Sequence, residues 1–270
     1  DSKGIQKLTA PLLEQHGKDI HENLPLYLIQ QFKLMERADA YRNMHFPEDA
    51  AKLNEAIYRL KFEELFFIQL KLLKNKLQRI QKFKGHIFES VGNYFNEFYH
   101  HKLPFELTNS QKKVLKEIRQ DTQRGVQMNR LLQGDVGSGK TVVALMSMLI
   151  AIDNGFQTCI MAPTEILANQ HYQTIKNLVG DDFIEVALLT GSTKKKERNI
   201  LHEKLESGQL KILIGTHALI EDKVQFQNLG FVVIDEQHRF GVEQRAKLWR
   251  KNAVPPHILV MTATPIPRTL

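Results

Sequence analysis

The stretch LLQGDVGSGKT, residues 131–141, decides the fold of this chain. It fits the pattern GxxxxGK(S/T) through Gly134, Gly139, Lys140 and Thr141, and it lies between a short apolar run and a helix-length segment. A glycine-rich turn of this kind wraps backbone N–H groups around phosphate oxygens at the positive end of a helix dipole. The lysine reaches the β- and γ-phosphates, and the threonine offers its hydroxyl to Mg²⁺. The sequence therefore predicts a site for ATP and Mg²⁺, in preference to a chance glycine-rich turn.

Short apolar runs alternate with helix-length segments on both sides of this loop. The runs are RLLQ, TCIMA, EVALL, KILIG, FVVID and HILVMT, and segments such as TVVALMSMLIAI and EILANQHYQTIKNL separate the earlier ones. Strands that are continuously apolar and separated by helices are typical of a parallel sheet with helices on both faces. We therefore expect an α/β fold over residues 105–270, with a doubly wound, mostly parallel sheet.

A pair of acidic residues follows one of these apolar runs, in FVVIDEQH at residues 231–238. The run delivers Asp235 to the carboxyl edge of the sheet, where ligands of open α/β sheets bind. Asp235 is placed to hold Mg²⁺ through water, and Glu236 to orient the water that attacks the γ-phosphate. An Asp-Glu pair alone usually marks a solvated turn. Together with the glycine-rich loop, it makes Lys140, Asp235 and Glu236 the candidate catalytic residues.

The first 104 residues show helical signals only. The stretch HFPEDAAKLNEAIYRLKFEELFFIQLKLL opens with Pro47 and two acidic residues, which suits the first turn of a helix. Apolar residues then recur at spacings of three and four. We expect one or two long helices, the later one broken or bent near Gly85 or Gly92, with their apolar faces packed on neighbouring segments.

The chain is basic, with 37 Lys and Arg against 30 Asp and Glu and a net charge of +7. This charge is compatible with a polyanionic partner such as nucleic acid, but it does not establish one. The densest basic stretch, KLLKNKLQRIQKFK at residues 71–84, interleaves its charges with apolar residues at helical spacing. We interpret it as an amphipathic helix with a solvated basic face, in preference to a dedicated DNA-binding stripe.

The sequence shows no sign of a membrane segment or a disulfide framework. Its longest apolar run, ALMSMLIAI at residues 144–152, is shorter than the roughly 18 to 20 residues of a membrane span. The first ten residues, DSKGIQKLTA, are polar and do not resemble a secretory leader. The lone Cys159 suits a reducing compartment, as a buried strand residue more than as a nucleophile. We expect a cytoplasmic protein with no membrane partner.

Several motifs resemble those of a known family of enzymes. GDVGSGKT, DEQH and TATPIPRTL resemble motifs of the superfamily 2 DNA helicases. The longer strings MNRLLQGDVGSGKT, MAPTEILANQH, LLTGSTKKKER, ILIGTHALI, VVIDEQHRFGVEQR and MTATPIPRTL are similar to the first motor domain of the RecG-type helicases of bacteria. The helical stretch before them also resembles the connection that leads into that domain.

Two other functions share part of this pattern. Transcription-repair coupling translocases share the HRFGV and TATPIPRTL stretches, but the motif sequences GDVGSGKT and DEQH, with the helical linker, favour the RecG type. A small-molecule P-loop kinase would fit GDVGSGKT equally well. It leaves DEQH, GTHALI and TATPIPRTL unexplained.

The resemblance implies an ATP-dependent DNA helicase that acts on branched DNA, reversing replication forks and processing Holliday junctions in recombination and repair. It implies a helical linker region at residues 1–104 and a RecA-like motor domain at residues 105–270, with the second motor domain, the wedge domain and the C-terminal element lying outside this sequence. A chain of this kind is expected to bind ATP and DNA weakly and to have little activity alone. The expected partners are forks and Holliday junctions, with a monomeric state and a possible contact with single-stranded DNA-binding protein.

The resemblance also carries roles onto individual residues. Gln111, in LPFELTNSQ, matches the glutamine that reads adenine, and it completes a nucleotide-binding set with Gly134, Asp135, Val136, Gly137, Ser138, Gly139, Lys140 and Thr141. Thr141 and Asp235 are the expected metal ligands. The DNA backbone is expected to contact Pro163, Thr164, Gln170, Thr190, Gly191, Gly215, Thr216 and His217. Coupling between the nucleotide and DNA sites is expected from His238, Arg239, Thr262 and Thr264.

Overall fold

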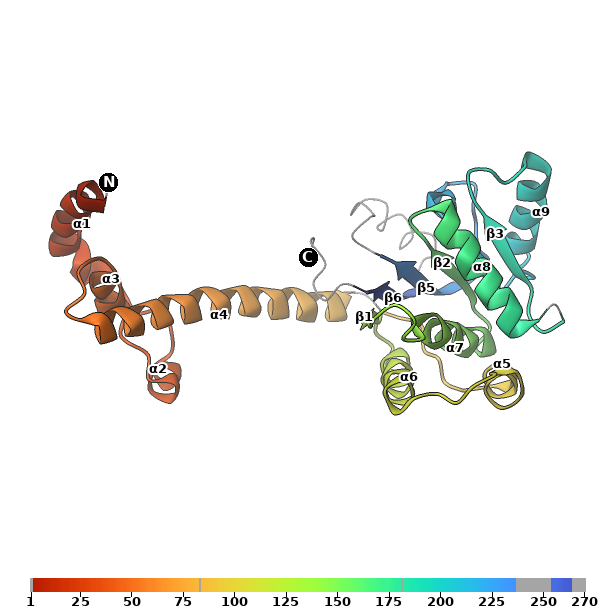
Figure 1. Cartoon of the computed structure of the whole chain (residues 1–270), viewed down its shortest axis with the longest axis horizontal. Coiled ribbons are helices and arrows are strands. Elements are labelled where there is room, and N and C mark those ends of the chain that lie inside the picture. The colour runs from red at the N-terminus through yellow and green to blue at the C-terminus, as the bar shows by residue number, and fades with distance from the viewer. Residues whose placement is uncertain (1, 83, 181, 237–253, 264–270) are drawn as a thin grey trace. The chain divides into compact units, whose positions relative to one another are not determined.

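The chain divides into two compact units, Asp1–Arg79 and Ile80–Leu270 (Figure 1). The computed structural model describes residues 2–82, 84–180, 182–236 and 254–263. Residues 80–104, which the sequence grouped with the helical region, fold with the second unit. Phe88 and Phe98 from this segment are buried in the core of that unit.

The regular elements that the structure describes in the first unit are helical, as predicted. They are α1 (Ser2–His16), η1 (Gly17–Asp19), α2 (Leu26–Phe32), α3 (Arg37–His45) and α4 (Ala50–Lys82), which extends past the boundary between the units. The start predicted for the long helix was too early, because Asp49 precedes it: its carboxylate accepts a hydrogen bond from the backbone N–H of Lys52 at 2.7 Å. Asp49 therefore caps the helix from outside its first turn.

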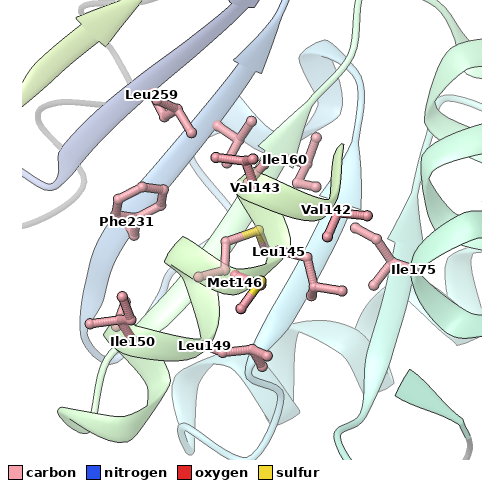
Figure 2. Close-up of a cluster of buried hydrophobic side chains, with 14 of the residues drawn as sticks. Val142, Val143, Leu145, Met146, Leu149, Ile150, Ile160, Ile175, Phe231 and Leu259 are labelled. Atoms are coloured by element: carbon pink, nitrogen blue, oxygen red, sulfur yellow. The ribbon is translucent and has the colours of Figure 1, made fainter. Parts of the chain in front are cut away.

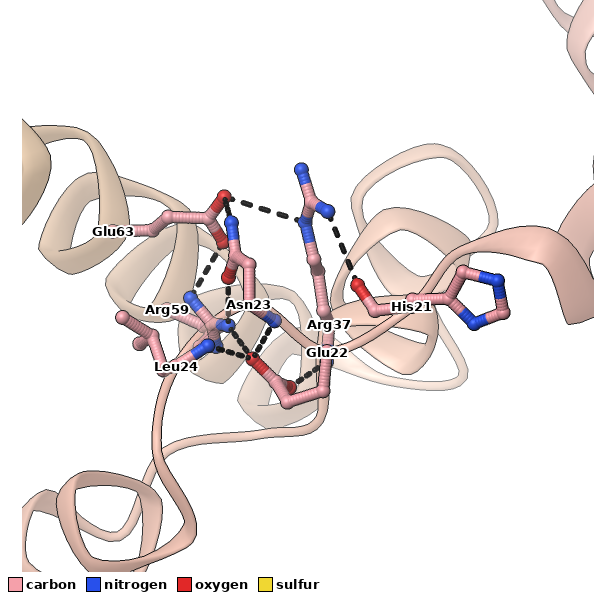
Figure 3. Close-up of polar contacts among 7 residues, drawn as sticks. All are labelled: His21, Glu22, Asn23, Leu24, Arg37, Arg59 and Glu63. Carbon is pink, nitrogen blue, oxygen red and sulfur yellow. Dashed lines mark hydrogen bonds and ion pairs between the residues drawn. The ribbon is translucent and has the colours of Figure 1, made fainter.

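A polar cluster around the buried Arg59 joins α4 to the segment before α2 and to α3 (Figure 3). Arg59 is fully buried and forms ion pairs with Glu22 at 2.5 Å and Glu63 at 2.7 Å. Glu63 also accepts a hydrogen bond from Asn23 at 2.5 Å and pairs with Arg37 at 3.3 Å. The cluster satisfies charges that would otherwise be costly to bury.

The C-terminal half of α4 differs from its predicted packing. Residues 67–78 are all exposed, including the apolar Leu72 at 54% and Leu77 at 60%. The buried residues of α4, such as Ala56 and Arg59, lie in its first half, where the other helices of the first unit contact it. The basic stretch is thus helical and solvated through residue 78, but its apolar side chains are solvated as well.

The second unit is built on a six-stranded sheet in the order β1-β6-β5-β2-β4-β3, with every pair of strands parallel. This confirms the predicted α/β fold. The strands are β1 (Asn129–Gln133), β2 (Gln157–Met161), β3 (Val186–Leu189), β4 (Ile212–Gly215), β5 (Leu229–Asp235) and β6 (His257–Thr262). The helices are α5 (Asn93–Glu97), η2 (Phe98–Lys102), α6 (Asn109–Thr122), α7 (Lys140–Asp153), α8 (Glu165–Val179), α9 (Lys195–Glu206) and η3 (His217–Ile220).

The sheet is covered on both faces, as its continuously apolar strands predict. In β5, Phe231 and Val233 face one core while Val232 and Ile234 face the other. Helices α6, α7 and α8 pack in the first core, where residues 142–152 of α7 are all buried (Figure 2). The second core contains residues of α9 and η3. This layered packing fixes the strand ends that carry the predicted site residues.

Two smaller predictions are also resolved. The expected break near Gly85 or Gly92 lies between α4 and α5, where the Asp153 carboxylate accepts hydrogen bonds from the backbone N–H of Gly92 at 2.9 Å and Phe95 at 3.0 Å. Cys159 is fully buried in β2, as a strand residue should be. Among the helices that the structure describes, none combines the length and apolar character needed to cross a membrane.

Candidate functional site

Most of the predicted site residues that the structure describes gather along the carboxyl edge of the parallel sheet. Strand β6 lies between β1 and β5, so the glycine-rich loop after β1 and the acid pair after β5 flank the end of β6. The backbone N–H of Gly134 donates to the carbonyl of Thr262 at 3.3 Å, which joins the start of the loop to β6. Three motifs that are far apart in sequence therefore meet at one place.

The phosphate loop, residues 134–141, is shaped by glycine and held by its own lysine. Gly137 and Gly139 have φ of +80° and +81°, a left-handed conformation that other residues adopt only with strain. Lys140 begins α7, and its Nζ donates to the carbonyls of Gly134 at 2.6 Å and Asp135 at 2.8 Å. The ammonium group is thus held over a loop that is open to solvent, where it can meet a bound phosphate.

Gln111 lies beside the phosphate loop at the start of α6. Its Nε2 donates to the carbonyl of Ser138 at 3.0 Å, which connects the helix directly to the loop. Its Oε1 accepts from the backbone N–H of Thr108 at 2.9 Å, and the Thr108 hydroxyl accepts in return from the Gln111 N–H at 3.3 Å. This capping box fixes the carboxamide next to the nucleotide site, so reading an adenine edge requires it to exchange these partners.

The acid pair terminates β5 in two different environments. Asp235 is 9% exposed, and its Oδ2 lies 2.8 Å from Nε2 of His171 on α8. Glu236 has a φ of +48°, in the left-handed region, and its N–H donates to the carbonyl of Met261 at 3.0 Å. Strained backbone of this kind is typical of functional sites.

The last residue of β6 and the residue after it hold the Glu236 carboxylate. The Thr262 hydroxyl donates to Oε2 at 3.3 Å, and the Ala263 backbone N–H donates to Oε1 at 3.3 Å. Strands β5 and β6 are adjacent, with Asp235 paired with Met261 in the sheet register. The other predicted coupling residues, His238, Arg239 and Thr264, lie outside the described residues.

The donor atoms at this edge fit Mg²⁺ that arrives with a nucleotide. Thr141 and Asp235 supply a hydroxyl and a carboxylate, which are the hard oxygen ligands that Mg²⁺ prefers. Within the described ranges, no group of three or more His, Cys, Asp or Glu could cage a metal ion. Mg²⁺ usually binds through one or two protein oxygens together with phosphates and water, so this sparse set matches its chemistry.

Most residues predicted to contact DNA lie in the turns after β2, β3 and β4 at the same edge of the sheet, whereas Gly215 ends β4 and Gln170 lies on α8. Thr164, Gln170, Gly191 and His217 are exposed, Pro163 is half-buried, and Thr190, Gly215 and Thr216 are buried. The Thr190 hydroxyl lies 2.9 Å from that of Ser192, within its own turn. The Thr216 hydroxyl has no hydrogen-bond partner among the described residues. The exposed members of this set are therefore open to contact by DNA in this structure.

Side chains that the sequence interpretation did not single out organise this surface. Glu165 accepts hydrogen bonds from the N–H and hydroxyl of Ser192 at 3.2 and 3.1 Å, linking α8 to the turn after β3. Arg198 donates to the carbonyl of Thr190 at 2.7 Å and pairs with Glu221 at 3.1 Å. His171 was also missed, although it is a polar residue on the otherwise apolar buried stripe of α8, and that signal could have identified it.

Comparisons with known proteins agree with this arrangement. Residues 108–270 match the DEAD/DEAH box helicase family. The ATP-dependent DNA helicase RecG of Synechocystis sp. is 48% identical over 93% of this chain, and that of Bacillus subtilis is 44% identical over 99%. The chain spans 30% and 39% of the lengths of these relatives. A solved structure of RecG bound to a three-way DNA junction aligns with a TM-score of 0.80 and 42% identity, covering 99% of this chain and 36% of that one.

Proposed function

The chain belongs to the DEAD/DEAH box helicase family, and we propose that it forms the ATP-binding part of a RecG-type DNA helicase that acts on branched DNA. The observation that carries this proposal is the meeting of the phosphate loop, the acid pair and Thr262 around the end of β6. A nucleotide site alone would serve many enzymes. Here the Glu236 carboxylate is held by the end of β6 and the residue after it. Such a link suits a motor in which the state of the nucleotide is passed on to the DNA-binding surface.

The nucleotide half of the mechanism uses four side chains of this chain. The N–H groups of the phosphate loop surround the phosphates, and Lys140 exchanges its carbonyl contacts for the β- and γ-phosphate oxygens. Thr141 and Asp235 would hold Mg²⁺, which neutralises phosphate charge when bound. Glu236 orients the attacking water through the carboxylate that Thr262 and Ala263 hold.

The DNA half of the proposal rests on the loops after β2, β3 and β4. Thr164, Gly191 and His217 are exposed there and offer hydroxyl, backbone N–H and imidazole groups for phosphate contacts. The structurally similar RecG was solved on a three-way DNA junction, which supports branched DNA as the substrate. Gln170 adds an exposed carboxamide on α8.

The proposal for the whole protein extends beyond what this chain contains. We assign residues 1–104 to a helical linker region, the last part of which, residues 80–104, packs with the second unit, and residues 105–270 to a RecA-like motor domain. The single cysteine supports a cytoplasmic location. Processing of forks and Holliday junctions in recombination and repair, a monomeric state and contact with single-stranded DNA-binding protein rest on the resemblance to RecG-type helicases.

Nucleotide binding and hydrolysis by the chain test the proposal directly. We expect binding of Mg²⁺-ATP by the wild-type chain, weak hydrolysis, and weaker binding by Lys140→Ala. Three-way DNA junctions should bind with an affinity that is insensitive to base sequence. ADP release that depends on a small-molecule acceptor and ignores DNA would instead identify a P-loop kinase and refute the helicase assignment.

A further inference from the structure

The contact between His171 and Asp235 joins a helix to the nucleotide site. Nε2 of His171 lies 2.8 Å from Oδ2 of Asp235, and both side chains are 12% exposed. The two residues are 64 positions apart and belong to α8 and β5. A well-formed hydrogen bond in this partly dry location restricts the carboxylate far more than a solvated contact would.

The local fold explains why a histidine can reach this acid. Strand β2 leads into α8 and pairs with β5, with Met161 opposite Ile234. Ala168 and Ile175 of α8 are fully buried, and His171 lies between them on the same stripe of the helix. A polar side chain on a buried stripe is costly unless it has a hydrogen-bond partner, and Asp235 provides one.

The direction of the hydrogen bond follows from the chemistry of its partners. A carboxylate only accepts, so Nε2 of His171 carries the proton and donates it to Oδ2. This bond fixes the rotation of the carboxylate about its side-chain bond. Further acceptor positions on the same carboxylate remain for water or a metal at the sheet edge.

We propose that His171 is a positioning residue of the nucleotide site, which orients the Asp235 carboxylate for the Mg²⁺ that accompanies ATP. This inference rests on the proposed function. Hydrogen-bond partners that orient a metal ligand usually change metal affinity or activity by about 10- to 100-fold when they are removed. A purely structural role would instead be to anchor α8 to the sheet.

Mg²⁺-dependent nucleotide binding distinguishes the two roles. The probe is a fluorescent, non-hydrolysable ATP analogue, titrated into the 270-residue chain over a range of Mg²⁺ concentrations and in EDTA. His171→Leu removes the donor, while His171→Gln places an amide donor near the position of Nε2. Gln173→Ala, at an exposed position of the same helix, is the matched control.

For His171→Leu we expect the Mg²⁺ concentration for half-maximal binding to rise about tenfold or more, with affinity in EDTA unchanged. For His171→Gln this Mg²⁺ concentration should stay within about threefold of the wild-type value, and for Gln173→Ala it should equal the wild-type value. If His171→Leu does not fold, His171→Asn, whose amide is too short to reach Oδ2, takes its place.

Two results would overturn the inference. One is a wild-type Mg²⁺ dependence in a folded His171→Leu or His171→Asn chain. The other is an equal loss of affinity with Mg²⁺ and in EDTA, which would assign His171 to anchoring the helix. Failure of the wild-type chain itself to bind the analogue would refute the proposed function, so the two failures are separable.

Discussion

Lys140 and Glu236 lie at the same sheet edge, but they should serve different steps. Lys140→Ala removes a charge-assisted contact with the phosphates, worth about 1.5 to 3 kcal/mol, so ATP affinity should fall about ten- to a hundredfold. Glu236→Gln keeps an oxygen acceptor for Thr262 or Ala263 but loses the base. Hydrolysis should then fall by about a hundredfold or more, with affinity nearly unchanged.

Equilibrium nucleotide binding and single-turnover hydrolysis, measured in a helicase with both motor domains, separate these phenotypes. Lys112→Ala, an exposed lysine on α6 outside the phosphate loop, provides the control for loss of positive charge. A loss of affinity in Glu236→Gln as large as that in Lys140→Ala would show that Glu236 binds nucleotide instead of activating water.

Thr262 connects the acid pair to the loop after β6 and should affect movement more than chemistry. In Thr262→Ala the Ala263 N–H still holds Oε1 of Glu236, so ATP hydrolysis should persist. The hydroxyl link to Oε2 is lost, and more ATP should be consumed for each fork unwound. The ratio is measured at saturating DNA with both motor domains present. An unchanged ratio, or equal loss of both activities, would reduce Thr262 to a residue that closes a turn.

His257 is buried and neutral, which gives the second unit a pH dependence. Its Nδ1 accepts from the Met128 N–H at 2.9 Å, and Nε2 donates to the carbonyl of His86 at 2.8 Å. Burial lowers the pKa of His257 from 6.5 to about 4. Between these pH values the unfolded chain binds a proton at His257 and the folded chain does not. The free energy of unfolding therefore falls as the pH falls from 6.5 toward 4.

The contribution of His257 to this loss is at most about 3 to 4 kcal/mol, since one pKa unit corresponds to about 1.4 kcal/mol. Unfolding free energies at several pH values in this window measure it. His257→Asn, which has no titrating group, should show a shallower pH dependence, although burial also lowers the pKa of His86 and leaves a residual slope. An identical slope in wild type and His257→Asn would contradict the assignment.

At the scale of elements, α4 is fixed in the first unit by Arg59. Arg59→Met leaves Glu22 and Glu63 without their buried partner, so the free energy of opening of the first unit should fall by about 3 kcal/mol. Hydrogen exchange of residues 50–66 measures this opening without interference from the second unit. Lys52→Ala, which breaks an exposed ion pair with Glu55 on the same helix, should leave exchange unchanged. Equal effects of the two substitutions would show that burial of Arg59 contributes nothing.

Most elements could be predicted because their patterns are local. Most strands of the sheet are continuous apolar runs, and the helices between them begin after turn residues, so both follow from sequence alone. The start of α4 was missed because Asp49 can either join a first turn or cap the helix, and only the hydrogen bond to Lys52 decides. The exposure of Leu72 was missed because helical spacing does not say what covers a helix.

The parts of the site that lie in one continuous motif could be predicted from the sequence. The contacts between separate elements could not. The phosphate loop and the Asp235–Glu236 pair are each a short, contiguous stretch of the sequence. The pairing of His171 with Asp235, and of Glu165 with Ser192, depends on strand order, which the sequence does not state. The burial of Thr190 and Thr216 likewise depends on how the turns close.

At the scale of the whole molecule, backbone contacts with DNA predict a strong dependence on salt. The chain carries a net charge of +7, and its exposed candidate contacts are polar groups suited to phosphates. Affinity for a three-way junction should fall by about tenfold or more between 50 and 200 mM salt, and it should be the same for scrambled sequences. Fluorescence titrations with two junction sequences test both points. A strong preference for one sequence would contradict a helicase.

Within the part of the chain that the structure describes, the candidate nucleotide site is lined from one side, which limits the activity expected of the chain alone. The phosphate loop opens to solvent, with Val136 91% exposed, and the described candidate ligands for the phosphates and Mg²⁺ lie at the carboxyl edge of the sheet. In phosphoryl transfer an arginine from a second domain or partner can raise the rate by about a thousandfold or more, because it stabilises charge on the far side of the γ-phosphate. We therefore expect the 270-residue chain to bind Mg²⁺-ATP but to hydrolyse it at least about a thousandfold more slowly than a helicase with both motor domains. Phosphate release with and without a three-way junction measures the rate, with Lys140→Ala as the control for a contaminating ATPase. Rapid, junction-stimulated hydrolysis by the chain alone would show that its own residues complete the site.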